Sequence, residues 1–91
     1  MPRLEGKTAL ITGATGGIGE AIAKRYLEEG ANVVLAGRSE TKLKETRGRL
    51  SEYSAIAASV GDAADEGDVR RAVSTAVEEF GGLDILVANA G

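Results

Sequence analysis

The chain shows two patterns of hydrophobic and polar residues in alternating segments. One pattern is typical of buried strands and the other of amphipathic helices. Short apolar runs bounded by turn residues predict strands at Lys7–Thr12, Asn32–Ala36, Ser54–Val60 and Leu83–Asn89. Between them, apolar residues recur at helical spacing and predict helices at Glu20–Glu29, at Glu40–Leu50 and from Asp65 to Phe80. Strands and helices therefore alternate over the whole chain.

Residues that begin or end helices stand where this pattern needs them. Gly30 follows the first helix and Gly81 the third, and glycine commonly ends a helix. Ser39 and Asp65 precede the second and third helices as N-caps, while Gly48 weakens the last turn of the second. The apolar sides expected to face the core are Ile18, Ile22, Tyr26 and Leu27 in the first helix and Val69, Ala72, Val73, Ala76, Val77 and Phe80 in the third.

This alternation with short connections predicts an α/β fold, a Rossmann-like doubly wound parallel sheet with right-handed crossovers. We expect the strand order 3-2-1-4 with three helices, and the run Ile85–Val87 is apolar enough for the middle of a sheet. Since crossovers leave the first strand in opposite directions, a ligand crevice is expected at the carboxyl ends of the first and fourth strands, with Gly13 and Gly91 at its rim. Residues 1–91 are thus expected to form one partial nucleotide-binding domain.

Composition and charge narrow the classes of function. The 91 residues are 43% hydrophobic and 27% charged, as in ordinary globular proteins. A net charge of −3 with scattered Lys and Arg argues against a nucleic-acid-binding surface. No apolar run is long enough to cross a membrane and residues 1–7 lack the apolar core of a secretory signal, so a cytoplasmic location is expected. With neither Cys nor His, a metal site is not expected, and imidazole acid–base chemistry is excluded for this polypeptide.

A glycine-rich turn joins the first strand to the first helix, where residues 12–19 read Thr-Gly-Ala-Thr-Gly-Gly-Ile-Gly. Such a turn lets the backbone approach a pyrophosphate, and the helix after it directs unpaired N–H groups and its positive dipole end at the anion. Glycine turns also serve only to reverse a chain or cap a helix, but here a strand and a helix flank the turn. We therefore predict a dinucleotide site formed by Thr12, Gly13, Thr15, Gly16, Gly17, Ile18 and Gly19.

The spacing of these glycines identifies a family. Gly13, Gly17 and Gly19 form G-x-x-x-G-x-G, which differs from the G-x-G-x-x-G of the general dinucleotide fingerprint. Together with Thr12 and Ile18 this spacing resembles the cofactor loop of the short-chain dehydrogenase/reductase family. The resemblance implies an NAD- or NADP-dependent oxidoreductase.

The end of the second strand predicts which cofactor is bound. The chain there reads Ala-Gly-Arg-Ser, about twenty residues after the glycine turn, where the adenosine ribose is expected. Gly37 stands where NAD-dependent members of the family usually carry an acid, and Arg38 can meet a 2′-phosphate with charge-assisted hydrogen bonds. NADP is therefore expected rather than NAD, although a solvated Arg38 at a helix start remains the alternative. Ser39 is expected to cap its helix and to share the phosphate.

An acidic residue follows the third strand. In the family that this chain resembles, an Asp at this place, commonly in an Asp-Val pair, meets the adenine amino group, and Asp62 with Ala63 matches the position. A carboxylate is the acceptor that an exocyclic amine needs. The alternative is that Asp62 serves only the turn before the next helix.

The chain ends with Val-Ala-Asn-Ala-Gly, which resembles the Asn-Asn-Ala-Gly segment of the same family with Ala88 in place of the first Asn. Asn89 is expected to bridge backbone groups of neighbouring strands, and Ala90 and Gly91 leave space beside the cofactor ribose. Replacement of the first Asn removes one supporting hydrogen bond.

The catalytic residues implied by the resemblance are absent. Family members carry a catalytic Ser and a Tyr-x-x-x-Lys motif beyond the Asn-Ala-Gly segment, whereas Tyr26 and Tyr53 are followed four residues later by Gly30 and Ala57. No catalytic residue is therefore predicted in these residues.

The function expected from the sequence is that of an NADP-binding N-terminal half of such an oxidoreductase, truncated before its catalytic motif. Alone it is expected to bind the nucleotide without turnover. The alternative is a structural or interaction module that associates through the open edge of the fourth strand, with itself or with a missing C-terminal half.

Overall fold

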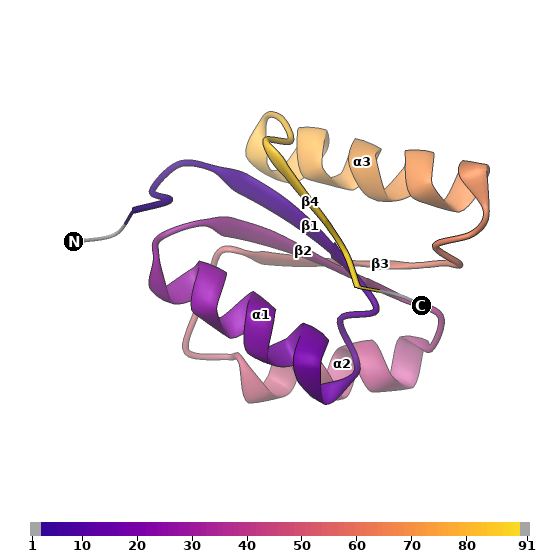
Figure 1. Ribbon diagram of the computed structural model, residues 1–91, viewed down its shortest axis with the longest axis horizontal. Helices are drawn as coiled ribbons and strands as arrows, with labels where there is room; N and C mark the ends of the chain where they lie inside the picture. Colours follow the sequence, from indigo (N-terminus) through magenta and orange to yellow (C-terminus); the bar gives the residue numbers. More distant parts are fainter. Residues whose placement is uncertain (1–2, 90–91) are drawn as a thin grey trace.

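The computed structural model describes residues 3–89, which form a four-stranded parallel sheet with three helices (Figure 1). The strands are β1 (Thr8–Thr12), β2 (Asn32–Gly37), β3 (Ile56–Val60) and β4 (Ile85–Ala88). The helices are α1 (Gly17–Glu28), α2 (Glu40–Arg49) and α3 (Glu66–Phe80). The strand order β3-β2-β1-β4 confirms the predicted order and the Rossmann-like architecture.

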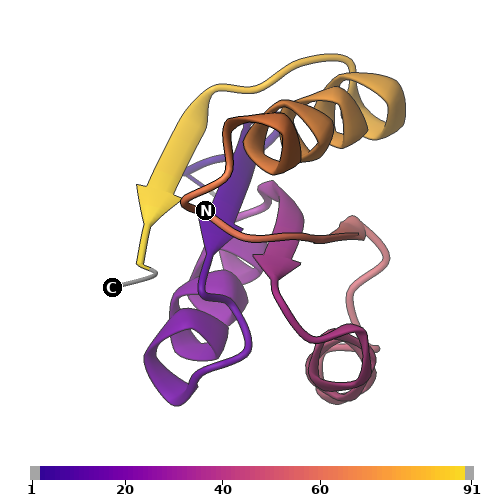
Figure 2. The same cartoon turned by 90° about the vertical axis from the view of Figure 1, so that its right-hand side faces the viewer.

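The helices form two layers, with α1 and α2 on one face of the sheet and α3 on the other (Figure 2). On the first face Ile11 of β1 packs in one core cluster with Leu27 of α1 and Leu43 of α2. On the opposite face Leu10 belongs to a second cluster with Ala72 of α3. Successive residues of β1 point to opposite faces and all five are buried, as expected for a parallel strand covered on both sides.

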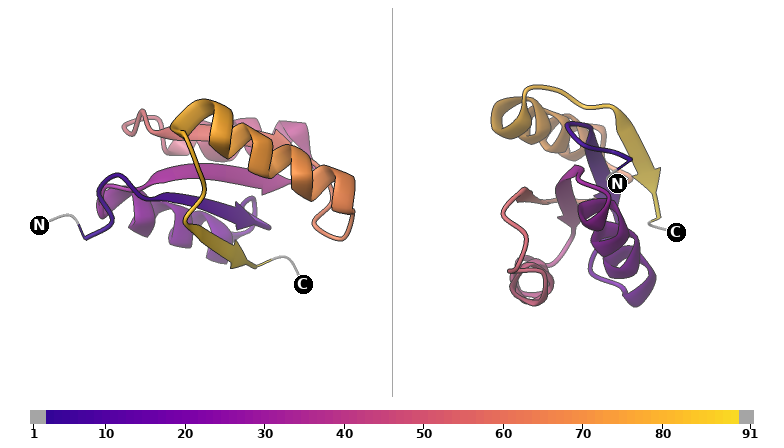
Figure 3. Two further views of the ribbon diagram at one scale, coloured as in Figure 1. Left: turned by 90° about the horizontal axis from the view of Figure 1, so that it is seen from above. Right: turned by 90° about the vertical axis from the view of Figure 1, so that its left-hand side faces the viewer.

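Strand β4 lies at the edge of the sheet, beside β1 (Figure 3). The pair is parallel, with Ala9 opposite Ile85 and Ile11 opposite Val87. In the part of the chain that the structure describes, β4 pairs on one side only, as the predicted order 3-2-1-4 requires, although its run Ile85–Val87 is apolar enough for the middle of a sheet. Leu86 is consequently 58% exposed.

Two residues predicted to face the core lie mainly in solvent. Helix α1 begins at Gly17, three residues before the predicted start, and Ile18 in its first turn is 72% exposed. Val77 of α3 is 51% exposed, while Ala72 and Ala76 are buried. Helices that lie close on a sheet turn small residues toward it, and the larger apolar residues at the margin of the stripe then remain outside.

The predicted caps are confirmed. The hydroxyl of Ser39 accepts a hydrogen bond from the Lys42 N–H at 3.2 Å, and the carboxylate of Asp65 accepts one from the Asp68 N–H at 2.9 Å. Gly30 and Gly81 adopt φ angles of +88° and +86° just after α1 and α3, where a left-handed residue ends a helix. These caps set the points at which each helix meets the carboxyl or amino ends of the strands.

Candidate cofactor-binding site

A cleft of about 320 Å³ opens at the carboxyl ends of β1, β2 and β3. These ends face the viewer in Figure 2. The sequence prediction named seven of the residues that line the cleft: Thr12, Gly13, Thr15, Arg38, Ser39, Asp62 and Ala63. Three turns that are far apart in the sequence therefore meet at one site.

The turn after β1 is built on two glycines in contact. Gly13 has a φ of +63°, a left-handed conformation that favours glycine. A Cβ at Gly19 would stand 2.2 Å from the Gly13 carbonyl oxygen, so only glycine fits there. Gly16 is the N-cap of α1 and has no side chain to accept from the first N–H groups of the helix. The turn therefore keeps its backbone close-packed and leaves the start of α1 without a side-chain cap, as an anion site requires.

Asn89 secures this turn from the neighbouring strand. Its side-chain Nδ2 donates to the Gly13 carbonyl oxygen at 3.2 Å, and its backbone N–H donates to the Thr12 hydroxyl at 3.1 Å. The same hydroxyl donates to the Val87 carbonyl oxygen at 3.3 Å. The Asn89 side chain therefore joins the end of β4 to one backbone group of the turn after β1.

The end of β2 and the turn after it are held against the turns after β1 and β3 by backbone hydrogen bonds. The Ala14 N–H donates to the Ala36 carbonyl oxygen at 3.1 Å, and the Gly61 N–H donates to the Gly37 carbonyl oxygen at 2.8 Å. A Cβ at Gly37 would lie 3.1 Å from the Thr15 methyl group, which is a tight contact. A small residue at this place lets the first two turns approach each other.

Arg38 and Asp62 form an ion pair across the mouth of the cleft. The Arg38 Nε lies 3.8 Å from Asp62 Oδ1, and both side chains are well exposed. The same carboxylate oxygen accepts the Ala64 N–H at 2.8 Å. The cation predicted for a phosphate and the acid predicted for a base therefore stand side by side at the mouth of the cleft.

The other predicted residues lie around the cleft. Gly16 and Gly17 are exposed at the start of α1, and Gly19 is buried beneath the turn. Ile18 points away from the cleft, where it lines a separate shallow apolar surface on α1. The crevice was expected between the first and fourth strands, whereas the cleft extends from β1 toward β3, and none of its lining residues in the described chain belongs to β4. Ala90 and Gly91 lie outside the described residues.

Sequence reasoning missed two charged residues of the cleft, Lys42 and Asp68. Each lies three residues after a helix cap, Ser39 and Asp65 respectively, and so on the first turn of a helix that begins at the cleft. That spacing was a usable signal, because a residue in the first helical turn shares the end of the helix with its cap.

Asp68 is the acidic residue of the cleft whose ionisation is shifted. Its carboxylate accepts the backbone N–H of Asp62 at 2.8 Å and pairs with the Arg71 guanidinium. The hydrogen bond from Asp62 and then the charge of Arg71 lower the pKa of Asp68 below its ordinary value. The carboxylate therefore stays ionised at neutral pH.

The two tyrosines of the chain lie outside the lining of the cleft. Burial raises the pKa of Tyr53, the opposite of what a phenolic proton donor near a cation requires, and Tyr26 packs against the core. Within residues 3–89 no three Asp or Glu side chains gather to hold a metal ion. None of the helices in this range has the length and apolar character needed to span a bilayer.

Comparison with known proteins places the chain among dehydrogenases. A family model described as short chain dehydrogenase matches residues 7–91. Glucose 1-dehydrogenase of Gluconobacter oxydans (strain 621H) is 48% identical over 91 residues, which cover 98% of this chain and 34% of that protein.

Solved structures give the same result. L-sorbose reductase from Gluconobacter frateurii, complexed with NADPH and L-sorbose, matches at a TM-score of 0.87 and 40% identity over 97% of this chain and 34% of its own. A 3-ketoacyl-(acyl-carrier-protein) reductase from Brucella melitensis, complexed with NADH, matches at a TM-score of 0.83 and 43% identity over 91% of this chain and 33% of its own. The chain thus spans about one third of the length of these relatives.

Proposed function

Because the chain belongs to the short chain dehydrogenase family, we propose that it is the NADP(H)-binding N-terminal part of an oxidoreductase that interconverts a carbonyl and an alcohol. The observation that carries the proposal is the convergence of the glycine turn, Arg38 and Asp62 on one cleft. The close-packed pair Gly13 and Gly19 fits a pyrophosphate site. A Cβ at Gly19 would displace the Gly13 carbonyl oxygen, and the turn would lose the compact shape that lets its backbone approach the phosphates.

Each turn contributes to a different part of the nucleotide. The turn after β1, residues 12–19, holds the pyrophosphate with backbone N–H groups and the start of α1. The turn after β2 holds the ribose phosphate with Arg38 and Ser39, and the turn after β3 offers the Asp62 carboxylate to the adenine amine. Asn89 keeps the first turn in place, and Ala90 and Gly91 are proposed to leave space beside the cofactor ribose. When bound, a nicotinamide cofactor supplies or accepts the hydride.

A preference for NADP over NAD rests on charge. The relatives include a reductase complexed with NADPH and one complexed with NADH, so family membership alone leaves the choice open. In this chain Arg38 follows Gly37 at the end of β2, and Lys42 adds a second cation to the same cleft. The 2′-phosphate of NADP carries two negative charges, whereas the Asp62 carboxylate carries one. The phosphate can therefore replace Asp62 as the ion-pair partner of Arg38.

Nucleotide titration tests the proposal. The thermal unfolding temperature of the chain is measured at increasing NADP and NAD, since a ligand that binds only the folded chain raises its stability. We expect a larger rise with NADP, and in Arg38→Ala a loss of about 10- to 100-fold in NADP affinity with little change for NAD. Arg70→Ala, an exposed arginine of α3 outside the cleft, is the matched control. Absence of any rise with either nucleotide contradicts the proposal, and equal rises remove the role of Arg38.

The chain alone is proposed to bind without catalysis. Proton transfer to or from the substrate oxygen needs a positioned acid, and the Tyr-x-x-x-Lys motif is absent from this sequence. A mixture of the chain, NADPH and a panel of carbonyl compounds is expected to show no steady consumption of NADPH. Steady consumption contradicts this part of the proposal.

A second candidate function is an interaction module that uses the edge of β4. Leu86 is 58% exposed there, and the outer side of β4 is unpaired within residues 3–89. Open strand edges pair with other strands, so self-association or pairing with a C-terminal half is proposed. Sedimentation velocity at low and high concentration tests it, and a monomer at every concentration contradicts self-association.

For the location we propose the cytoplasm, as expected from the sequence. Fractionation of cells that express the whole protein checks this assignment.

A further inference from the structure

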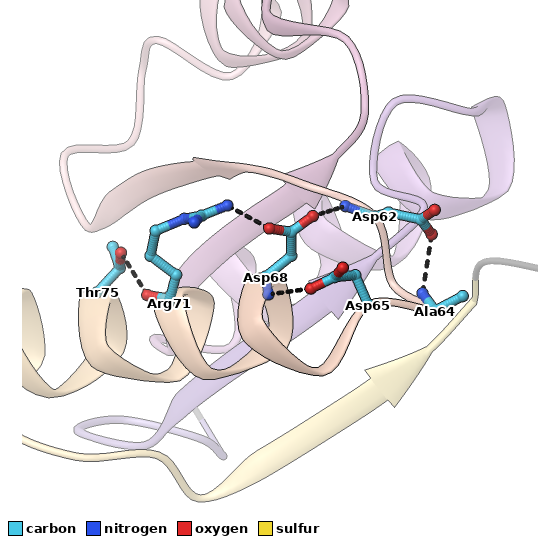
Figure 4. A network of polar contacts seen from close by, with 6 residues as sticks. All are labelled: Asp62, Ala64, Asp65, Asp68, Arg71 and Thr75. Atoms are coloured by element: carbon cyan, nitrogen blue, oxygen red, sulfur yellow. Dashed lines mark hydrogen bonds and ion pairs between the residues drawn. The ribbon is translucent and has the colours of Figure 1, made fainter.

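Asp68 links the first turn of α3 to the turn after β3 (Figure 4). One carboxylate oxygen accepts the backbone N–H of Asp62 at 2.8 Å, and the other pairs with the Arg71 guanidinium. The backbone N–H of Asp68 donates in turn to the Asp65 cap at 2.9 Å. The Asp65 cap and Arg71 therefore both fix the position of Asp68, whose carboxylate contacts the Asp62 N–H.

Gly61 allows this close approach. A Cβ at Gly61 would lie 2.7 Å from the Asp68 Cβ and 3.0 Å from its carboxyl carbon, so any side chain there would push the carboxylate away. The Gly61 N–H also donates to the Gly37 carbonyl oxygen at 2.8 Å, which ties the same turn to β2. The backbone around Asp62 is thus held between α3 and the neighbouring strand.

The direction of the Asp62 side chain follows from this backbone. Its Oδ1 accepts the Ala64 N–H at 2.8 Å and lies 3.8 Å from Arg38. For the other oxygen, Oδ2, the structure shows no hydrogen-bond partner between residues 3 and 89. Asp62 lines the cleft, and a carboxylate oxygen without a partner is an acceptor that the amino group of a bound base needs.

We propose that Asp68 is a positioning residue, which holds the backbone N–H of Asp62 so that the Asp62 carboxylate recognises the exocyclic amine of a purine in the cleft. The inference rests on the proposed function. It adds that recognition of the base depends on α3, through Asp68. Loss of Asp68 frees the peptide between Gly61 and Asp62, so the direction of the Asp62 carboxylate is no longer fixed. The first consequence is lost discrimination between bases.

An acid in the first turn of α3 also interacts favourably with the helix dipole, so the test must separate positioning from stabilisation. NADPH is compared with its hypoxanthine analogue, in which the 6-amino group of adenine is replaced by an oxygen. Dissociation constants are measured by calorimetry on the 91-residue chain. If Asp68 only stabilises the fold, its loss weakens the binding of both nucleotides equally. If Asp68 positions Asp62, its loss removes only the preference for adenine.

The wild-type chain is expected to prefer NADPH over the hypoxanthine analogue by about 10-fold or more, the effect of one charged hydrogen bond. In Asp68→Ala the preference falls to about twofold or less, with the affinity for the hypoxanthine analogue unchanged. Asp68→Asn keeps a carbonyl acceptor for the Asp62 N–H and is expected to retain most of the preference. Glu66→Gln, an exposed acid of the same helical turn outside the cleft, is the matched control.

Gly61→Ala is the second variant, since it displaces the same carboxylate without removing it. It decides the question if Asp68→Ala does not fold, as judged by circular dichroism. An unchanged preference in the folded variants overturns the inference and leaves the proposed function standing. If the wild-type chain binds both nucleotides without preference, the inference is overturned together with the proposed role of Asp62 toward adenine, while nucleotide binding itself stands. If the wild-type chain binds neither nucleotide, the proposed function itself fails.

Discussion

The side-chain amide of Asn89 donates a hydrogen bond to the Gly13 carbonyl oxygen across 3.2 Å, joining the end of β4 to the turn after β1. Gly19 packs against that same carbonyl from below. The carbonyl oxygen therefore has Asn89 and Gly19 as close neighbours, and both restrict the turn that faces the cleft. Residues that lie outside the cleft are thus part of its construction.

Asn89→Asp tests this relationship. Aspartate cannot donate to the Gly13 carbonyl oxygen, so we expect a loss of about 1 kcal/mol in the free energy of unfolding and weaker NADPH binding. Urea denaturation and calorimetry measure the two effects. Asn32→Ala is the control, because Asn32 makes a comparable bond to the Thr8 hydroxyl at the amino ends of the strands, far from the cleft. Its stability should fall without a change in NADPH affinity, and parallel loss of affinity in both variants contradicts the prediction.

Two glycine substitutions are expected to act in opposite directions. Gly19→Ala forces a Cβ to within 2.2 Å of the Gly13 carbonyl oxygen, so overpacking should cost about 1–3 kcal/mol and distort the turn. Gly48→Ala lies inside α2 with nothing within 4 Å of the new Cβ, and should stabilise the fold by about 0.5–1 kcal/mol. Chemical denaturation of both variants measures the difference. A stable, NADPH-binding Gly19→Ala variant would disprove the close packing of the turn.

Acid denaturation is expected to depend on Asp68. Because the hydrogen bond from Asp62 and the charge of Arg71 lower the pKa of Asp68 in the folded chain, the carboxylate stabilises the fold at any pH above its unfolded value. This contribution disappears as pH falls from about 4 through the lower folded pKa. The free energy of unfolding of the wild-type chain should therefore drop more steeply below pH 4 than that of Asp68→Asn. Parallel curves from urea denaturation at stepped pH would contradict this assignment.

A charge on the edge of β4 is expected to reduce self-association. Leu86→Lys places a cation on the exposed strand edge, and edge lysines discourage pairing with another strand. Val77→Lys changes an apolar residue of similar exposure on α3 and is the matched control. Sedimentation velocity should show a lower association constant only for Leu86→Lys. An equal decrease in both variants would assign association to general hydrophobic exposure rather than to the strand edge.

The order of elements could be predicted from the sequence because it depends on local periodicity and on end signals. The strand order β3-β2-β1-β4 followed from alternating strands and helices with short connections, and the Ser39 and Asp65 caps followed from residue type. Element ends were less accurate. Helix α1 begins at Gly17 rather than Glu20, because three glycines near its start hid the beginning of the helical pattern.

The exposure of particular apolar residues could not be predicted in the same way. Ile18 and Val77 fit the apolar stripes of their helices, yet both are mostly exposed. Which side of a stripe faces the sheet depends on the angle between the helix axis and the strands. Periodicity in the sequence does not determine that angle.

The glycine turn, the cation after β2 and the acid after β3 were determined by the sequence itself, because each follows a strand end at a position that chain direction and strand order bring to one edge of the sheet. Only the tertiary structure decided that Arg38 pairs with Asp62, that Lys42 and Asp68 enter the cleft, and that Asn89 holds Gly13. These contacts join residues from different turns and helices. Their distances depend on how the layers pack, which no local pattern specifies.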